Sequence, residues 1–160
     1  MRIVCLESPF KPSKDDIATY SGRFSVTELL RQNIVYARMA LLNALKLGEA
    51  PLASHLLYTQ VWTERDDLRD AGIKAGIELH HRADAVVLYV DLGTSAGMKR
   101  AADNARLIGV ELLTRSILDA ASGKDPREEL QKHDVVAFSY LEELERTSSI
   151  SRLRTEQEIA

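Results

Sequence analysis

The sequence "DAVVLYVDLGTSAGMKRAADNARLIGVELLT" (residues 84–114) places a glycine-containing turn and an amphipathic stretch between two apolar runs. Residues 85–90 form a continuous apolar run, which is typical of a parallel strand buried on both faces. Ser95 begins the amphipathic stretch, and the second apolar run follows Gly109. The pattern predicts a strand, a helix and another strand, which is the repeating unit of a parallel sheet.

The same alternation extends toward the N-terminus. The predicted elements are a strand at 2–8, a long loop at 9–25, a helix at 26–47, a strand at 49–54 and a helix at 63–83. Gly72 and Gly76 share one face of the last helix and predict a close neighbour there. The polar residues 119–160 are expected to be helical, with a frayed end. We therefore expect an α/β protein with a parallel sheet flanked by helices.

Composition restricts the function classes. A chain of 160 residues with a net charge of -3 fits one domain and carries no basic excess for a nucleic acid polymer. No apolar run approaches the roughly 20 residues that span a bilayer. We expect a cytoplasmic protein with no membrane partner. Cys5 is the single cysteine, so no intramolecular disulfide can form, and its apolar surroundings predict a buried thiol.

Ligands of such sheets bind beyond the carboxyl ends of the strands. The segment after the central strand is suited to an anion: Gly93 and Gly97 let the backbone approach, and the hydroxyls of Thr94 and Ser95 can donate at a helix N-terminus. The alternative is that Thr94 or Ser95 only caps the helix.

Aromatic and histidine side chains near the same edge are further candidates. Phe10, Tyr58 and Trp62 can stack on a base or can cover the core. His55 can donate to a base or phosphate or can be a hydrogen-bonded structural residue. His80 and His81 suggest helix C-terminal caps rather than metal ligands, and we expect no metal and no cofactor.

Two carboxylates lie at predicted strand ends. Glu7 ends the first strand, where burial is costly unless the carboxylate is paired or used. Asp91 ends the central strand. Either side chain is a candidate catalytic residue.

Three turns carry a family resemblance: "SPF" at 8–10, "SHLLY" at 54–58 and "SAGM" at 95–98. With "ADAVVLYVD" and "LRDAGIKAGIEL", they resemble the small phage and bacterial proteins of the nucleoside 2-deoxyribosyltransferase-like superfamily, which includes 2-deoxynucleoside 5-phosphate N-hydrolases. The resemblance covers residues 2–115. It implies a single flavodoxin-like or Rossmann-like domain at 1–118 and a homo-oligomer. The inserted loop at about 11–28 and the helical C-terminal extension at 119–160 lie outside the resemblance.

The resemblance also implies a nucleotide or nucleoside phosphate ligand. The serine matching Ser95 contacts the 5-phosphate, and an aspartate matching Asp84 opens the central strand. The expected ligand-binding residues are Ser8, Pro9, Phe10, His55, Tyr58, Asp84, Gly93, Thr94, Ser95, Gly97 and Met98.

One position departs from the family pattern. Active members carry a nucleophilic glutamate six residues after that serine, where this chain has Ala101. Asp103 lies about 200° further round the helix and is expected to face away from the pocket. Glu7 or Asp91 remains as a substitute base.

Two functions follow from these residues. The first is a binding protein that holds a nucleotide or nucleotide-derived signal intact, as a phage sequestering protein would. The second is an enzyme that cleaves or transfers an N-glycosidic bond of nucleoside 5-phosphates. A structural module without a small ligand is a third interpretation.

Overall fold

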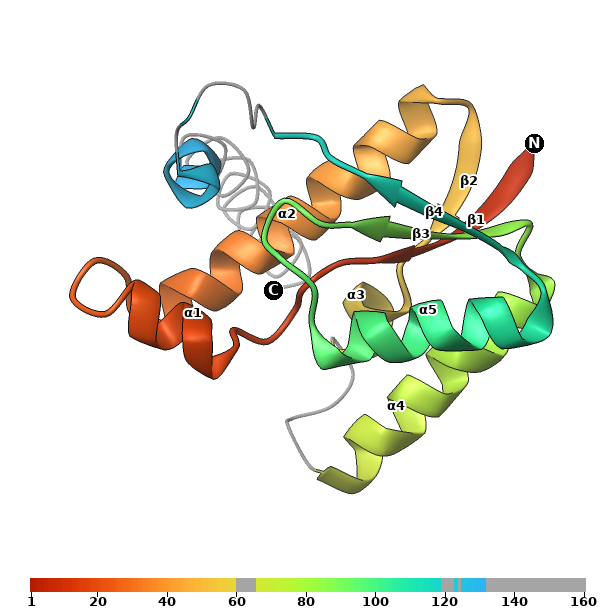
Figure 1. Ribbon diagram of the computed structural model, residues 1–160, viewed down its shortest axis with the longest axis horizontal. Helices are drawn as coiled ribbons and strands as arrows, with labels where there is room; N and C mark the ends of the chain where they lie inside the picture. Colours follow the sequence, from red (N-terminus) through yellow and green to blue (C-terminus); the bar gives the residue numbers. More distant parts are fainter. Residues whose placement is uncertain (60–65, 119–122, 124, 132–160) are drawn as a thin grey trace, which may run out of the picture.

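The computed structural model describes residues 1–59, 66–118, 123 and 125–131. This part of the chain forms one four-stranded sheet with strand order β2-β1-β3-β4 (Figure 1). The paired strands are all parallel. They are β1 (Arg2–Glu7), β2 (Glu49–Leu52), β3 (Ala85–Tyr89) and β4 (Glu111–Arg115). The predicted class, a single flavodoxin-like or Rossmann-like α/β domain, is confirmed.

Helices cover both faces of the sheet (Figure 1). They are α1 (Lys14–Thr19), α2 (Val26–Lys46), α3 (Ser54–Tyr58), α4 (Asp66–Leu79) and α5 (Ala96–Ile108), and a short 3₁₀ turn, η1 (His80–Arg82), follows α4. The long helix α2 lies on one side of the sheet, and α4 and α5 lie on the other.

The alternation of side chains along β3 explains its continuous apolar run. Val87 and Tyr89 pack in the core on the α2 side. Val86 and Leu88 pack on the opposite side, against Met98 and other residues of α5. Because successive strand residues point to opposite faces, a strand covered on both faces must be apolar at every position.

Two short helices correct the predicted connections. The segment 9–25 was predicted to be a loop, but it contains α1, which begins at a capping box between Ser13 and Asp16. The helix buries none of its own residues, so it has no apolar periodicity to recognise. Ser54 was assigned to the second strand and instead begins α3.

The described part of the C-terminal extension packs on the α2 side. Residues 126–131 are helical, and Leu118 and Leu130 belong to the core that includes Tyr36 of α2. The predicted helix over the other residues of 119–160 lies outside the described residues.

Gly76 confirms that the glycine face of α4 has a close neighbour. A Cβ atom at this position would lie 2.6 Å from the Ser54 hydroxyl oxygen, so α3 packs directly against α4.

Cys5 is buried, as predicted, and burial together with the nearby Glu7 charge raises the pKa of its thiol to about 11. Among the described residues, no helix has the length and apolar character needed to cross a membrane.

Candidate functional site

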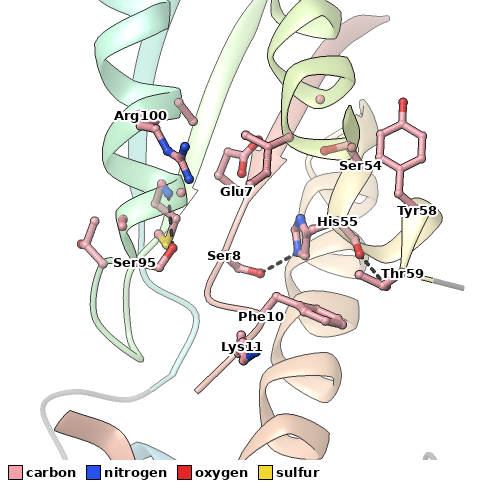
Figure 2. A pocket seen from close by; sticks show the side chains of 18 of the residues that line it. Glu7, Ser8, Phe10, Lys11, Ser54, His55, Tyr58, Thr59, Ser95 and Arg100 are labelled. Atoms are coloured by element: carbon pink, nitrogen blue, oxygen red, sulfur yellow. Dashed lines mark hydrogen bonds between the residues drawn. The ribbon is translucent and has the colours of Figure 1, made fainter. Parts of the chain in front are cut away.

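A cavity of about 580 Å³ opens at the carboxyl ends of the strands (Figure 2). Its walls come from the segment that follows β1, from α3, from α4 and from the start of α5. The volume lies within the range of roughly 300–1,000 Å³ that is usual for small-molecule sites. The sequence-predicted residues that line the cavity are Glu7, Ser8, Phe10, His55, Tyr58, Thr94, Ser95, Gly97 and Met98.

Ser95 both caps a helix and lines the cavity. Its hydroxyl oxygen accepts a hydrogen bond from the Met98 N–H at 3.2 Å, so the capping interpretation is confirmed. This bond uses the oxygen as an acceptor and leaves the hydroxyl proton to be donated elsewhere. The first turn of α5 also presents backbone N–H groups and the positive end of the helix dipole. Capping and anion binding are therefore compatible at this residue.

The two glycines of this turn have different roles. Gly93 has a φ of +83° and donates to the Val90 carbonyl at 2.8 Å, so it makes the turn after β3, and it is not among the residues that line the cavity. Gly97 lines the cavity, and an added Cβ atom would meet only the Ser95 hydroxyl oxygen at an ordinary 3.7 Å. The packing of the protein therefore does not require glycine at 97. Helix stability does not favour it either, because glycine costs a helix about 1 kcal/mol relative to alanine.

The cavity is also lined by two cationic side chains that were not predicted from the sequence, Arg100 and Lys11. Arg100 lies three residues after Gly97 on α5, and residues at this spacing share one helix face. Figure 2 shows the Arg100 side chain directed from α5 toward the cavity. The helical spacing from Gly97 was the sequence signal that would have found it.

Glu7 is the one carboxylate among the described residues that line this cavity. Its side chain is 16% exposed, and its Oε1 atom lies 3.3 Å from Nε2 of His80. His80 is fully buried, and its Nδ1 atom lies 3.4 Å from the side-chain nitrogen of Asn104. Because an amide nitrogen can only donate, His80 accepts at Nδ1 and donates from Nε2 to Glu7.

This contact corrects the prediction for His80. The side chain was expected to cap a helix end, but it fixes one oxygen of the cavity carboxylate instead. Glu7 and His80 are 73 residues apart, so local spacing carried no signal of their contact. His81 is exposed.

Ser8 and His55 form a second polar pair in the cavity wall. The Ser8 hydroxyl oxygen lies 3.0 Å from His55 Nε2. His55 Nδ1 is buried and has no hydrogen-bond partner among the described residues. Burial lowers the pKa of His55, and the Glu7 charge opposes this effect. The cavity wall therefore includes a neutral imidazole whose Nδ1 atom is buried and has no partner among the described residues.

Phe10 borders His55, with a T-shaped ring contact at 6.2 Å between centroids. Tyr58 lines the same side of the cavity. Trp62 lies outside the described residues.

Asp91 and Asp84 were expected at the site, and the structure places neither in the cavity lining. Asp91 accepts from the Tyr36 hydroxyl at 2.5 Å, from the Ile117 N–H at 3.0 Å and from the Ser116 hydroxyl. Its carboxylate therefore joins the segment after β4 to α2.

Asp84 lies at the amino end of β3, the end of the sheet away from the cavity. It accepts there from the Ile3 N–H at 2.7 Å and so connects β3 to β1. Pro9 is buried but is not a lining residue.

The face of α5 that meets the cavity includes Ala101. This side chain is 2% exposed and lines the cavity, whereas the Asp103 side chain is 75% exposed and pairs with Arg106 at 3.0 Å. The expectation that Asp103 faces away is confirmed. At residue 101 the cavity wall therefore carries a methyl group and no carboxylate.

Comparison with known proteins adds a family but no activity. No curated protein matches the chain. A family model described as a domain of unknown function, DUF7768, matches residues 2–115, which include all four strands and every element that lines the cavity. The chain belongs to the DUF7768 domain family.

Proposed function

We propose that the cavity binds a nucleoside 5-monophosphate, or a signal nucleotide that contains this unit, and holds it intact. The observation that carries the proposal is the order of chemical groups across the cavity (Figure 2). Hydroxyl and amide donors lie at the start of α5, a carboxylate lies at the end of β1, and aromatic and imidazole side chains lie beside α3. This order matches phosphate, sugar and base.

The phosphate subsite is the first turn of α5. Ser95 offers its hydroxyl proton, Gly97 leaves the backbone open, and Arg100 supplies a positive charge from the same helix. A helix N-terminus with hydroxyl donors and a guanidinium is suited to a phosphate dianion.

The sugar and base subsites follow from the remaining walls. Glu7 has one oxygen bound to His80, which leaves the other to accept from a sugar hydroxyl. The rings of Phe10 and Tyr58 offer stacking to a base, and the His55 ring lies in the same part of the cavity wall.

Retention of the ligand follows from Ala101. The enzymes that this chain resembles carry a glutamate at the matching position, and a methyl group cannot attack the anomeric carbon. The proposed role is therefore capture of the nucleotide rather than turnover.

The test uses AMP, GMP, CMP, UMP and their 2-deoxy forms. Binding is measured by calorimetry, and free base is followed by chromatography. We expect at least one of these nucleotides to bind without release of base. No binding by any of them would contradict the proposal.

The variant Ser95→Asp tests the phosphate subsite. Aspartate caps helices as well as serine does, but it places a negative charge where the phosphate would bind. The matched control is Ser25→Asp, because Ser25 caps α2 with the same 3.2 Å bond from an N–H three residues later and is not a lining residue. We expect Ser95→Asp to weaken binding by at least about tenfold and Ser25→Asp to leave it unchanged. Equal affinity in the two variants would argue against this subsite.

One observation favours a second function, hydrolysis of the N-glycosidic bond. Glu7 is the single described carboxylate in the cavity lining, and His80 fixes its orientation. In this alternative, Glu7 takes a proton from a water molecule that attacks the anomeric carbon while the base leaves. Release of base by the wild type, reduced by roughly 10²-fold or more in Glu7→Gln, would replace the capture proposal with this one.

A further inference from the structure

Arg127 is a buried cation outside the region that the family model matches. It is 1% exposed and lies in the helical residues 126–131. Its guanidinium pairs with Asp16 at 2.9 Å and lies 5.2 Å from the centre of the Tyr20 ring. A buried charge is costly unless it is paired and hydrogen-bonded, so such a residue has a specific structural task.

One connection runs from Arg127 to the cavity through Asn33. The Nη1 atom of Arg127 donates to Asn33 Oδ1 at 3.2 Å. The Asn33 amide nitrogen donates in turn to the carbonyl of Phe10 at 2.8 Å. Since a guanidinium can only donate, it fixes the Asn33 oxygen on its own side and directs the amide nitrogen to Phe10.

A second connection runs through Asp16. This carboxylate binds Arg127 with Oδ1 and accepts from the Ser13 N–H with Oδ2 at 2.9 Å. Ser13 lines the cavity, as do Lys11 and Pro12. Both ends of the cavity wall formed by residues 10–13 are therefore fixed by partners of one guanidinium.

We propose that Arg127 is a positioning residue for the base subsite, acting through Asn33 on Phe10 and through Asp16 on Ser13. The inference rests on the proposed function, because the base is the part of the ligand that Phe10 would contact. The phosphate subsite on α5 shares none of these bonds. Loss of Arg127 therefore weakens recognition of the base while contacts to the phosphate remain.

A second tether between the same segments provides the matched control. Arg23 pairs with Asp125 at 3.2 Å and with Glu128 at 2.6 Å, and its side chain is about half exposed. It joins the segment after α1 to residues 125–131 without a bond to Asn33 or Phe10. Arg23→Met removes a tether, and Arg127→Met removes a tether that leads to the cavity.

Asn33→Asp separates positioning from loss of the buried charge. The substituted carboxylate still accepts from Arg127 but has no proton for the Phe10 carbonyl. This variant tests the same connection if Arg127→Met does not fold.

The experiment compares two kinds of probe by calorimetry: the eight nucleotides named above, and ribose 5-phosphate, which has no base. We expect Arg127→Met and Asn33→Asp to weaken nucleotide binding by about tenfold, the range of one lost base stack, and to change ribose 5-phosphate binding less than about twofold. Arg23→Met should change neither. Equal weakening of both probes, or unchanged nucleotide binding, would overturn the inference.

A measurement without ligand separates this inference from the proposed function. Amide hydrogen exchange by NMR should become faster at Phe10 and Lys11 in Arg127→Met and Asn33→Asp, but not at Met98 of α5. If no nucleotide binds the wild type, the proposed function fails. The positioning role then stands on faster exchange confined to residues 10–13, and unchanged exchange would overturn it.

Discussion

The ends of β1 and β3 each carry a carboxylate, but the two carboxylates have different hydrogen-bond partners. Asp91, after β3, binds the hydroxyls of Tyr36 and Ser116 and the backbone N–H of Ile117. Glu7, the last residue of β1, has one long contact to His80 and lines the cavity. Both carboxylates lie at strand ends, and partners from distant elements decide which one stabilises the fold and which one lines the cavity.

The largest expected effect of this contrast is on stability at Asp91. Asp91→Ala leaves the Tyr36 hydroxyl and the Ile117 N–H without their acceptor, so we expect a loss of about 2–4 kcal/mol in the free energy of unfolding. Urea denaturation measures it. An Asp91→Ala protein of wild-type stability that no longer binds nucleotide would reverse the assignment of the two carboxylates.

Glu7→Gln should show the opposite behaviour. The amide oxygen can still accept from His80, so stability should change by less than about 1 kcal/mol. Loss of the charge should weaken nucleotide binding by about tenfold, because bonds to charged groups are worth roughly 1.5–3 kcal/mol. Calorimetry on the same nucleotide panel measures the change, and unchanged affinity would remove Glu7 from the sugar subsite.

Gly97 and Gly76 both line the cavity, but only Gly76 has a close protein neighbour. Gly97→Ala meets no close atom of the protein and should stabilise it by about 0.5–1 kcal/mol, yet the added methyl group should weaken nucleotide binding. Gly76→Ala should instead destabilise the protein, because its Cβ atom would lie 2.6 Å from the Ser54 hydroxyl oxygen. Thermal denaturation and calorimetry together measure both effects, and tighter binding by Gly97→Ala would contradict the proposed backbone approach.

His55 gives the smallest expected effect. Its pKa in the folded protein lies below its ordinary value of 6.5, so the unfolded chain binds more protons in this range. The stability that the neutral side chain contributes is complete above pH 6.5 and falls as the pH decreases toward the lowered pKa. We expect the Tm of the wild type to fall in this window more steeply than that of His55→Gln. Parallel curves would show that His55 is not held neutral by burial.

The sequence predicted what local patterns control. The apolar run of β3, the Ser95 cap of α5 and the outward direction of Asp103 depend on neighbours within a few residues, and all three are confirmed. The turns after β1 and β3 and the segment after β2 meet at the cavity because parallel strands end at one edge of the sheet.

The missed features depend on long-range contacts. His80 contacts Glu7 across 73 residues, and Arg127 contacts Asn33 across 94. Neither separation leaves a periodic signal in one sequence. Asp91 was predicted to line the cavity because the sequence shows that it follows a strand. The sequence does not show that its carboxylate accepts from the hydroxyls of Tyr36 and Ser116, which come from other parts of the chain.

A crystal structure of the protein with the tightest-binding nucleotide of the panel would show whether that nucleotide occupies the cavity. We expect the phosphate within hydrogen-bond distance of the Ser95 hydroxyl and the Gly97 N–H, with an intact glycosidic bond and the base beside Phe10. A nucleotide bound outside the cavity, or a phosphate turned away from α5, would contradict it.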